Sequence, residues 1–256
     1  MIFTRMLIMP AKTAICLSLF ALSATAWEQS NHGTSLLEHH TMTKLGSKAT
    51  TEISTHTREY WMGQAINALE VLDSPCPFAA FGTVIVNHTS STEIGDVVCI
   101  GANAISSSGN PTLHGEIAGI SNCTAVLTDP AGPYKLSPSE ALEAFKGLTL
   151  YTTAEPCPMC ATAVRWAGFR ECVFGTSIST LIQQGWSQID LPSSELFQRS
   201  SALGAHTNLL GEVLTNETGQ LFEWQFNASA MCPKGCEREQ AGGMCVPLRD
   251  NVHPDL

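Results

Sequence analysis

The sequence predicts an α/β fold in which helices cover both faces of a mostly parallel or mixed sheet. Three observations lead to this prediction. Short, apolar, β-branched runs alternate along the chain with longer stretches of helical period. The 256 residues are 44% hydrophobic, which is enough for a sizeable core. The length suits one main domain with smaller additions at its ends.

The first of these additions is the N-terminal segment 1–26. Arg5 and Lys12 precede an apolar run of 14 residues, 13–26. This run ends in the small residues Ala-Thr-Ala. These features are typical of a secretory signal peptide, so we expect the mature chain to begin near Trp27. A membrane anchor is the alternative, but spanning a bilayer takes roughly 20 residues. The sequence therefore predicts a secreted, extracellular protein with no membrane attachment after cleavage.

The mature chain predicted in this way is strongly acidic. Cleavage removes two basic residues and no acidic one, so the net charge changes from −10 to −12, with 11 Lys and Arg against 23 Asp and Glu. Binding to a phosphate backbone depends on Lys and Arg, so a long nucleic acid is disfavoured as a partner. Four N-glycosylation motifs agree with passage through a secretory pathway: Asn87, Asn122, Asn216 and Asn227.

A polar arm and then a helix follow the signal peptide. Residues 27–56 are rich in Ser and Thr and show no period, which predicts a loosely held arm. The main domain is expected over residues 57–227. Its first helix carries an apolar stripe that we expect to face the core: Tyr60, Met62, Ala65, Ile66, Leu69 and Leu72.

Strands and helices then alternate. Strands are expected in the apolar, β-branched runs 81–87, 96–103, 148–153 and 171–176. Helices are expected over residues 114–127, 137–147 and 157–167. The second of these helices begins with a capping box of Ser137 and Glu140, with Pro138 in its first turn. A short extended piece and a last helix within residues 210–226 complete the domain.

The cysteines divide into two groups. Ten are present, and Cys16 leaves with the signal peptide. If Cys157 and Cys160 bind a metal, an odd number remains, so some should pair in an oxidising compartment and at least one should stay free or bridge to another chain. The spacing leaves open the pairing among Cys76, Cys99, Cys123, Cys172, Cys232, Cys236 and Cys245. The last three lie in a Cys-, Pro- and Gly-rich tail, residues 228–256, which could close a pocket.

Two short motifs together predict a metal site. "TLHGEIAG" places His114 and Glu116 at one helix start, and "AEPCPMCATAV" places Cys157 and Cys160 at another. Alone, H-x-E is common, and C-x-x-C in a secreted chain is more often a disulfide or redox pair. Here Pro156 begins the helix, so both thiols lie on its first turn, where the helix dipole favours the thiolates that zinc binds. Three ligands leave a fourth position open, as in catalytic zinc sites.

Taken together, the two motifs resemble the H-x-E…P-C-x-x-C signature of the cytidine/deoxycytidylate-type zinc deaminase superfamily. "NPTLHGEI" and "LYTTAEPCPMC" are most similar to the branch with guanine deaminases, tRNA adenosine deaminases and small zinc cytosine deaminases. The resemblance covers roughly residues 57–226. It implies a three-layer α/β/α fold with a central mixed five-stranded sheet, one zinc ion per chain and a homodimer.

The resemblance also implies a mechanism for the site. His114, Cys157 and Cys160 would hold zinc, which lowers the pKa of its water. Glu116 would carry protons from this water to the substrate. The reaction would be a hydrolytic deamination that releases ammonia.

Three further residues are implied to contact the substrate. Asn103 and Phe81 stand where relatives place residues that contact or line the base, and Trp166 matches a tryptophan typical of guanine-deaminase-like members. Each also has a plainer interpretation. The first could be a loop asparagine that bonds its own backbone, the second a core aromatic, and the third a packed residue at a helix end.

The expected substrate is a small nucleobase or nucleoside, more a purine of the guanine or adenine type than a pyrimidine. Trp166 and "EPCPMC" favour the purine. Gly115, where alanine is more usual, and the likeness of "TLHGEI" and "LYTT" to small cytosine deaminases favour the alternative, a cytosine or cytidine deaminase. A second alternative is a non-catalytic secreted zinc-binding protein. The presence of Glu116 and of all three ligands disfavours it.

Overall fold

The computed structural model describes residues 52–89, 92–239 and 242–248. The predicted signal peptide, residues 1–26, and nearly all of the polar arm lie outside these residues. Within the described part, no helix combines the length and the apolar character needed to cross a membrane.

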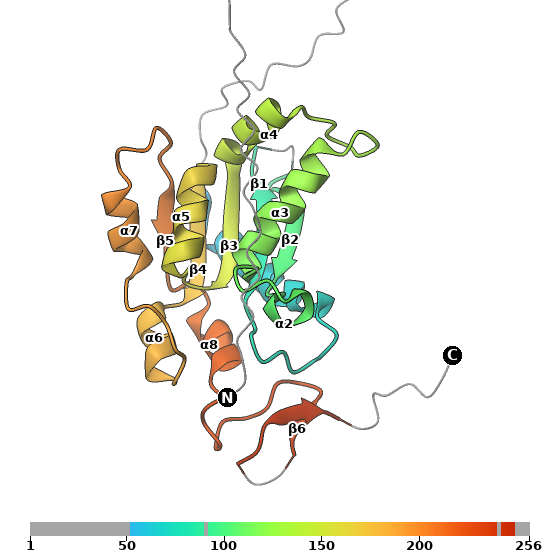
Figure 1. Cartoon of the computed structure of the whole chain (residues 1–256), viewed down its shortest axis with the longest axis vertical. Helices are drawn as coiled ribbons and strands as arrows, with labels where there is room; N and C mark the ends of the chain where they lie inside the picture. Colours follow the sequence, from blue (N-terminus) through green and yellow to red (C-terminus); the bar gives the residue numbers. More distant parts are fainter. Residues whose placement is uncertain (1–51, 90–91, 240–241, 249–256) are drawn as a thin grey trace, which may run out of the picture. The chain divides into compact units, whose positions relative to one another are not determined.

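A mixed five-stranded sheet forms the centre of the domain (Figure 1). Its strands are β1 (Gly82–Asn87), β2 (Asp96–Ala102), β3 (Leu148–Ala154), β4 (Glu171–Thr176) and β5 (Asn208–Leu210). Their order in the sheet is β2-β1-β3-β4-β5. β1 pairs antiparallel with β2 and with β3, whereas β3, β4 and β5 run parallel. This sheet confirms the predicted fold class.

Helices cover both faces of the sheet because successive strand residues point to opposite sides. Val84 and Tyr151 pack with α1 (Thr55–Asn67) on one face. Ile85 and Leu150, their neighbours in sequence, pack on the other face. That face is covered by α3 (Gly115–Thr128) and α5 (Pro158–Ala167), which lie in front of the sheet in Figure 1. The sheet is thus the middle of three layers.

The remaining helices are short. They are α2 (Ile105–Ser108), α4 (Pro138–Ala144), α6 (Ile178–Gln183), α7 (Ser193–Arg199) and α8 (Thr215–Thr218), with 3-10 turns at Ala68–Val71, Phe145–Gly147 and Gly219–Phe222. The capping box of Ser137 and Glu140 begins α4 as predicted. The predicted last helix is reduced to α8 and the 3-10 turn that follows it. Neither α6 nor α7 was predicted.

The first helix differs from its prediction in two details. It begins at Thr55, where the Ser54 side chain accepts a hydrogen bond from the Thr57 amide, and not at Thr57. Tyr60 was expected in the core but is 42% exposed, and Trp61 is buried in its place. The Trp61 indole donates a hydrogen bond to the Ile94 carbonyl over 2.7 Å, which satisfies its one polar group inside the fold.

Six of the seven remaining cysteines are paired in the structure. The pairs are Cys76–Cys236, Cys99–Cys123 and Cys232–Cys245, and Cys172 is a buried free thiol. The second pair joins β2 to α3. The other two hold the tail, where β6 (Cys236–Arg238) and β7 (Cys245–Pro247) form a two-stranded sheet. The tail is therefore joined covalently to the segment before β1.

Candidate metal centre

The two sequence motifs meet at one edge of the sheet. β2 and β3 both run antiparallel to β1, so their carboxyl ends lie together beside the start of β1. α3 begins after the loop that follows β2, and His114 is its N-cap. α5 begins just after β3, with Cys157 as its N-cap and Pro158 in its first turn. The fold thus brings two helix starts, more than forty residues apart in sequence, to one place.

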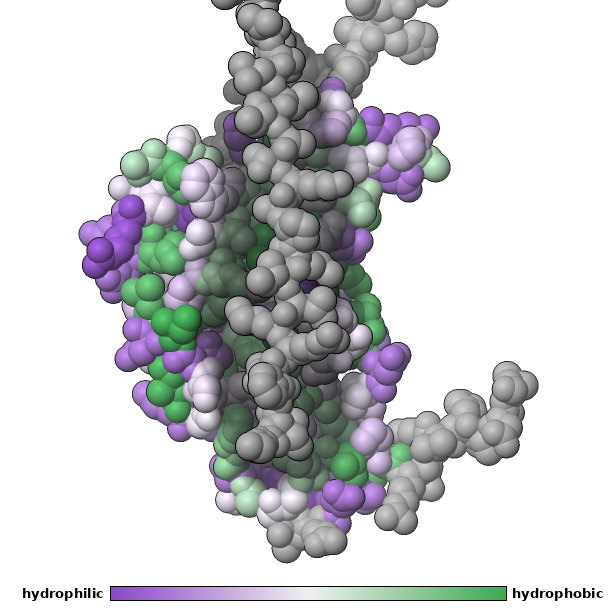
Figure 2. Space-filling model, in the orientation of Figure 1, coloured by the Kyte–Doolittle hydropathy of each residue, from purple (hydrophilic) through white to green (hydrophobic). Residues whose placement is uncertain are grey.

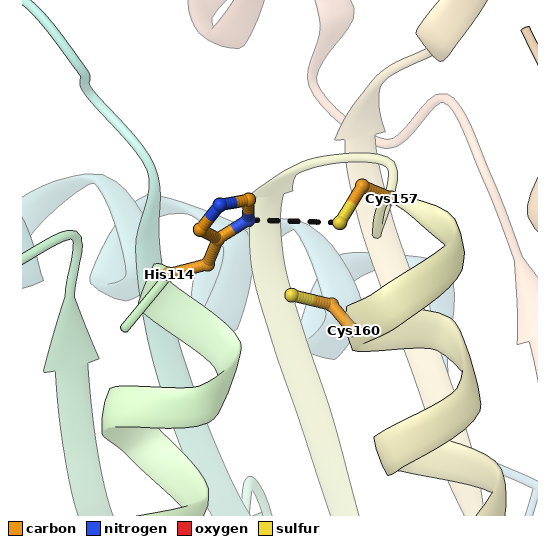
Figure 3. A group of neighbouring side chains, drawn as sticks. All are labelled: His114, Cys157 and Cys160. Atoms are coloured by element: carbon orange, nitrogen blue, oxygen red, sulfur yellow. Dashed lines mark hydrogen bonds between the residues drawn. The ribbon is translucent and has the colours of Figure 1, made fainter. Parts of the chain in front are cut away.

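The three predicted ligands lie within reach of a single ion. Figure 3 shows the His114 imidazole turned toward Cys157, with Cys160 directed into the same space. The ligand atoms lie within 4.8 Å of one another, and His114 Nδ1 is 3.6 Å from Cys157 Sγ. Ligands about 2.0–2.3 Å from a tetrahedral zinc ion are roughly 3.5–3.8 Å apart. One nitrogen and two sulfurs therefore fit zinc in both chemistry and spacing. Among the described residues, no other group of three possible ligands was found.

The two thiols share one proton. A hydrogen bond from Cys160 is the main reason why the pKa of Cys157 falls to about 4, and the His114 imidazole lowers it further. The same bond raises the pKa of the Cys160 thiol. One thiolate is thus already formed at neutral pH. A bound cation would displace the remaining proton, since thiolates are the form that binds metals.

Glu116 is buried in the first turn of α3, with 3% of its surface exposed. Burial raises its pKa to about 7, and the nearby Cys157 charge acts in the same direction. A carboxyl group with a pKa near neutrality can both accept and return a proton at physiological pH. The geometry leaves Glu116 outside the ligand group, so the carboxyl group is available for this role.

Gly115 is explained by a close approach of two backbones. A Cβ atom at this position would lie 2.4 Å from the Phe81 carbonyl oxygen at the start of β1. The contact is with backbone, which cannot rotate away as a long side chain can. The glycine thus lets the start of α3 lie directly against β1, with His114 and Glu116 on either side of the contact.

Replacing Gly115 by alanine is expected to destabilise the protein by about 1–3 kcal/mol, the usual cost of overpacking. The matched control is Gly63→Ala in α1, where the added methyl group would meet no atom within 4 Å apart from its chain neighbours and the backbone of its own helix. Removal of a helical glycine there should be neutral or stabilise by up to about 1 kcal/mol. Urea unfolding of both variants measures the difference. Equal midpoints would contradict the close approach.

Two of the predicted substrate residues lie beside this centre. The Phe81 carbonyl accepts a hydrogen bond from the backbone N–H of Asn103 over 2.9 Å. The same carbonyl lies against Gly115, so both residues are close to the start of α3. Asn103 also bonds locally, because its Oδ1 accepts from the Ile105 amide over 3.2 Å. Its Nδ2 makes no hydrogen bond within the described residues. The side-chain oxygen of Asn103 thus bonds the local backbone, as the plainer interpretation expected. Its side-chain nitrogen remains available to a ligand.

Phe81 stands in an aromatic wall that was not predicted. Its ring centroid lies 5.5 Å from that of Trp186 and 4.9 Å from that of Phe222. The Trp186 indole donates to the Phe222 carbonyl over 2.8 Å. We call these three side chains the aromatic wall. They come from segments far apart in sequence, and no local pattern marks the last two.

Trp166 requires a correction, because the structure does not bring it to the centre. It lies in the last turn of α5, 72% exposed, six residues or about 9 Å of helix beyond Cys160. It lines a groove of about 350 Å³ between α5 and α7 together with Leu196 and Leu203. Figure 2 shows hydrophobic residues among hydrophilic ones on this side of the molecule. The sequence correctly placed Trp166 on this helix, but it did not predict that the side chain would be exposed to solvent.

The four glycosylation motifs occupy different surroundings. Asn216 and Asn227 are exposed. Asn122 is also exposed, but its Nδ2 donates to the Ile100 carbonyl over 2.9 Å. Asn87 is half-buried at the end of β1. The first two motifs are therefore the most accessible.

One histidine and two cysteines at neighbouring helix starts, with a buried glutamate beside them, match the His/Cys/Cys zinc site and the proton-carrying glutamate of zinc-dependent deaminases. Comparison with known families agrees. Residues 55–176 match the family described as "Cytidine and deoxycytidylate deaminase zinc-binding region", a stretch that includes all four residues. Over this stretch, somewhat less than half of its length, the chain is similar to that family.

Individual proteins are similar to this chain at 20–30% sequence identity. Guanine deaminase of Bacillus subtilis (strain 168) is 30% identical over 121 residues, which cover 45% of this chain and 65% of that protein. A probable cytosine deaminase of Schizosaccharomyces pombe is 30% identical over 103 residues, 40% of this chain and 51% of that one. The chain therefore matches less than two thirds of either relative. A solved guanine deaminase from Nitrosomonas europaea is 20% identical, with a TM-score of 0.47 over 64% of this chain and 81% of that one.

Proposed function

We propose that the protein is a zinc-dependent hydrolytic deaminase of a free nucleobase or nucleoside, with a purine preferred. The observation that carries this proposal is the group of His114, Cys157 and Cys160 within 4.8 Å, with Glu116 buried beside it. A non-catalytic zinc protein has no need for a buried carboxyl group next to its ligands, because burial of a charge is costly.

The side chains of this centre divide the work between them. His114, Cys157 and Cys160 would hold the ion. Bound there, zinc supplies a Lewis acid that makes water acidic near neutral pH. Glu116 would take one proton from the attacking water and give it to a ring nitrogen, and would then carry the proton of the newly added hydroxyl group to the departing ammonia. Its burial excludes bulk water, so the proton stays within the site.

A purine is supported by the surroundings of the centre. Phe81 and Trp186 of the aromatic wall are half-buried and offer ring surface, whereas Phe222 is fully buried. Stacking of a base on an aromatic side chain contributes about 1–3 kcal/mol, with more area available to a bicyclic ring. The free Nδ2 of Asn103 can donate to a ring edge. A mature chain with a net charge of −12 and only 11 basic residues has few Lys and Arg side chains with which to bind a phosphate group. Trp166 favoured a purine in the sequence. Its exposed position in the last turn of α5 does not support a contact with a base bound in the same chain.

Cytosine is the second candidate substrate, because the two curated relatives carry one name of each kind at the same 30% identity. The test compares kcat/KM for guanine, adenine and cytosine, for their nucleosides and for their monophosphates. We expect the highest value for a purine base or nucleoside. A preference for cytosine would support the second candidate. A preference for monophosphates or RNA would contradict the argument from charge.

We also infer a secreted glycoprotein that forms a homodimer. The signal-peptide pattern, the four glycosylation motifs and the paired cysteines support secretion. In a eukaryotic secretion host, the protein in the medium should begin near Trp27 and lose mass on glycosidase treatment. Light scattering should give twice the chain mass. Retention of the intact N-terminus inside the cell would contradict the inferred secretion.

A further inference from the structure

Glu155 is a buried carboxylate that the proposed mechanism does not use. It follows β3 and comes two residues before Cys157, and 8% of its surface is exposed. One carboxylate oxygen accepts from the Ile178 amide over 2.8 Å at the start of α6. The other accepts from the Ser193 amide over 2.6 Å at the start of α7. A single side chain thus caps two helices that begin far from it in sequence.

The Ser193 side chain completes the connection to the cysteines. Its hydroxyl group donates to the Pro156 carbonyl over 2.8 Å, and the residue is 1% exposed. That carbonyl belongs to the peptide group directly before Cys157. The Glu155 amide in turn donates to the Thr176 carbonyl at the end of β4 over 2.8 Å. The turn that presents Cys157 is therefore held from both sides by buried hydrogen bonds.

The same connection reaches the aromatic wall through α6. Leu181 of this helix is fully buried, and its carbonyl accepts a hydrogen bond from the Trp186 amide over 3.0 Å. The Trp186 ring then contacts Phe81. A change in the position of the start of α6 would thus move one side of the aromatic wall relative to the cysteine turn.

We propose that Glu155 is a positioning residue that sets the cysteine turn and the aromatic wall at a fixed distance from each other. Its carboxylate would determine how well the three ligands suit a metal and where the base lies relative to Glu116. Residues that orient metal ligands from outside commonly change metal affinity by 10- to 100-fold when they are replaced. The part of this inference that concerns the base rests on the proposed function. The part that concerns the metal rests only on the group of His114, Cys157 and Cys160.

The test uses the full mature chain loaded with cobalt(II) in place of zinc. In Glu155→Gln the side chain keeps its size, but its amide nitrogen faces a backbone N–H that needs an acceptor. We expect the visible absorption bands of cobalt to shift, metal affinity to fall about 10- to 100-fold, and KM for the preferred base to rise at least about tenfold. Affinity is measured by competition with a chelator, so this readout does not depend on turnover.

Glu171→Gln is the matched control. This glutamate is also buried, at the opposite end of β4, and both its oxygens accept from Arg58 over 3.0 Å. Its replacement should lower thermal stability and leave the cobalt spectrum and affinity at parental values. If Glu155→Gln also lowers only thermal stability, Glu155 has a structural role alone and the proposal is overturned.

Ser193→Ala keeps the test decisive if Glu155→Gln does not fold. It removes only the hydrogen bond to the Pro156 carbonyl, and we expect a several-fold loss of cobalt affinity with a small spectral shift. A parental spectrum and affinity in Ser193→Ala would overturn the proposal. A parent that binds cobalt but deaminates no base would contradict the proposed function, while the metal measurements would still decide the role of Glu155.

Discussion

Glutamine in place of Glu116 is expected to lower kcat/KM about 10²- to 10⁴-fold, the range found when a positioned proton carrier is lost. The change keeps the shape of the side chain and removes its ability to accept and return a proton. Metal content should not change, because Glu116 lies outside the ligand group. The measurement combines ammonia release on the preferred base with zinc content of the same sample.

Glu59→Gln is the control for this experiment. Glu59 is exposed on α1, on the face of the sheet opposite to α3. The same chemical change there should leave turnover and zinc content as in the parent. A Glu116→Gln variant with parental kcat/KM would show that another group carries the proton.

Removal of the Cys76–Cys236 bridge is expected to have the largest effect on stability. The two cysteines are 160 residues apart, and the chain-entropy argument gives about 5 kcal/mol for a loop of this length. Cys76→Ser with Cys236→Ser also frees the tail. In the parent, Gln225, which lies shortly before the tail, donates from Nε2 to the Phe78 carbonyl over 2.8 Å, so this contact with the segment before β1 should loosen as well. Urea unfolding without reductant measures the loss.

The Cys232–Cys245 bridge provides the comparison. It joins residues 13 apart within the tail, for which the same argument gives about 3 kcal/mol, and less where the tail unfolds by itself. The double serine variant of this pair should therefore lose less global stability than that of Cys76 and Cys236. The reverse order would contradict the pairing or its role in holding the tail.

The central part of the site could be predicted because its signals are local. A histidine and a pair of cysteines each stood at a recognisable helix start. Pro156 was expected to begin the second helix, which in the structure begins two residues later, at Pro158. The resemblance then joined the two motifs into one site. The sheet was predictable for a similar reason, since four of its strands are apolar runs of six or seven residues.

Features that depend on distant contacts were not predictable. Tyr60 and Trp61 are neighbours with similar hydrophobic character. Trp61 is the buried one because it packs with Val84 in the core and donates a hydrogen bond to the Ile94 carbonyl, contacts that come from distant segments. α6 and α7 have six and seven residues, too few for a helical period to stand out. Trp166 shows that a position along a helix does not give the direction of the side chain. The signal peptide and the glycosylation sites stay predictions from the sequence.

X-ray absorption at the zinc edge of the purified protein tests the central claim most directly, since that claim is one zinc ion held by His114, Cys157 and Cys160. We predict about one zinc per chain, with two sulfur neighbours at about 2.3 Å and nitrogen or oxygen neighbours at about 2.0–2.1 Å. A zinc shell without sulfur, a shell of four sulfurs, or a protein that binds no zinc would contradict the account.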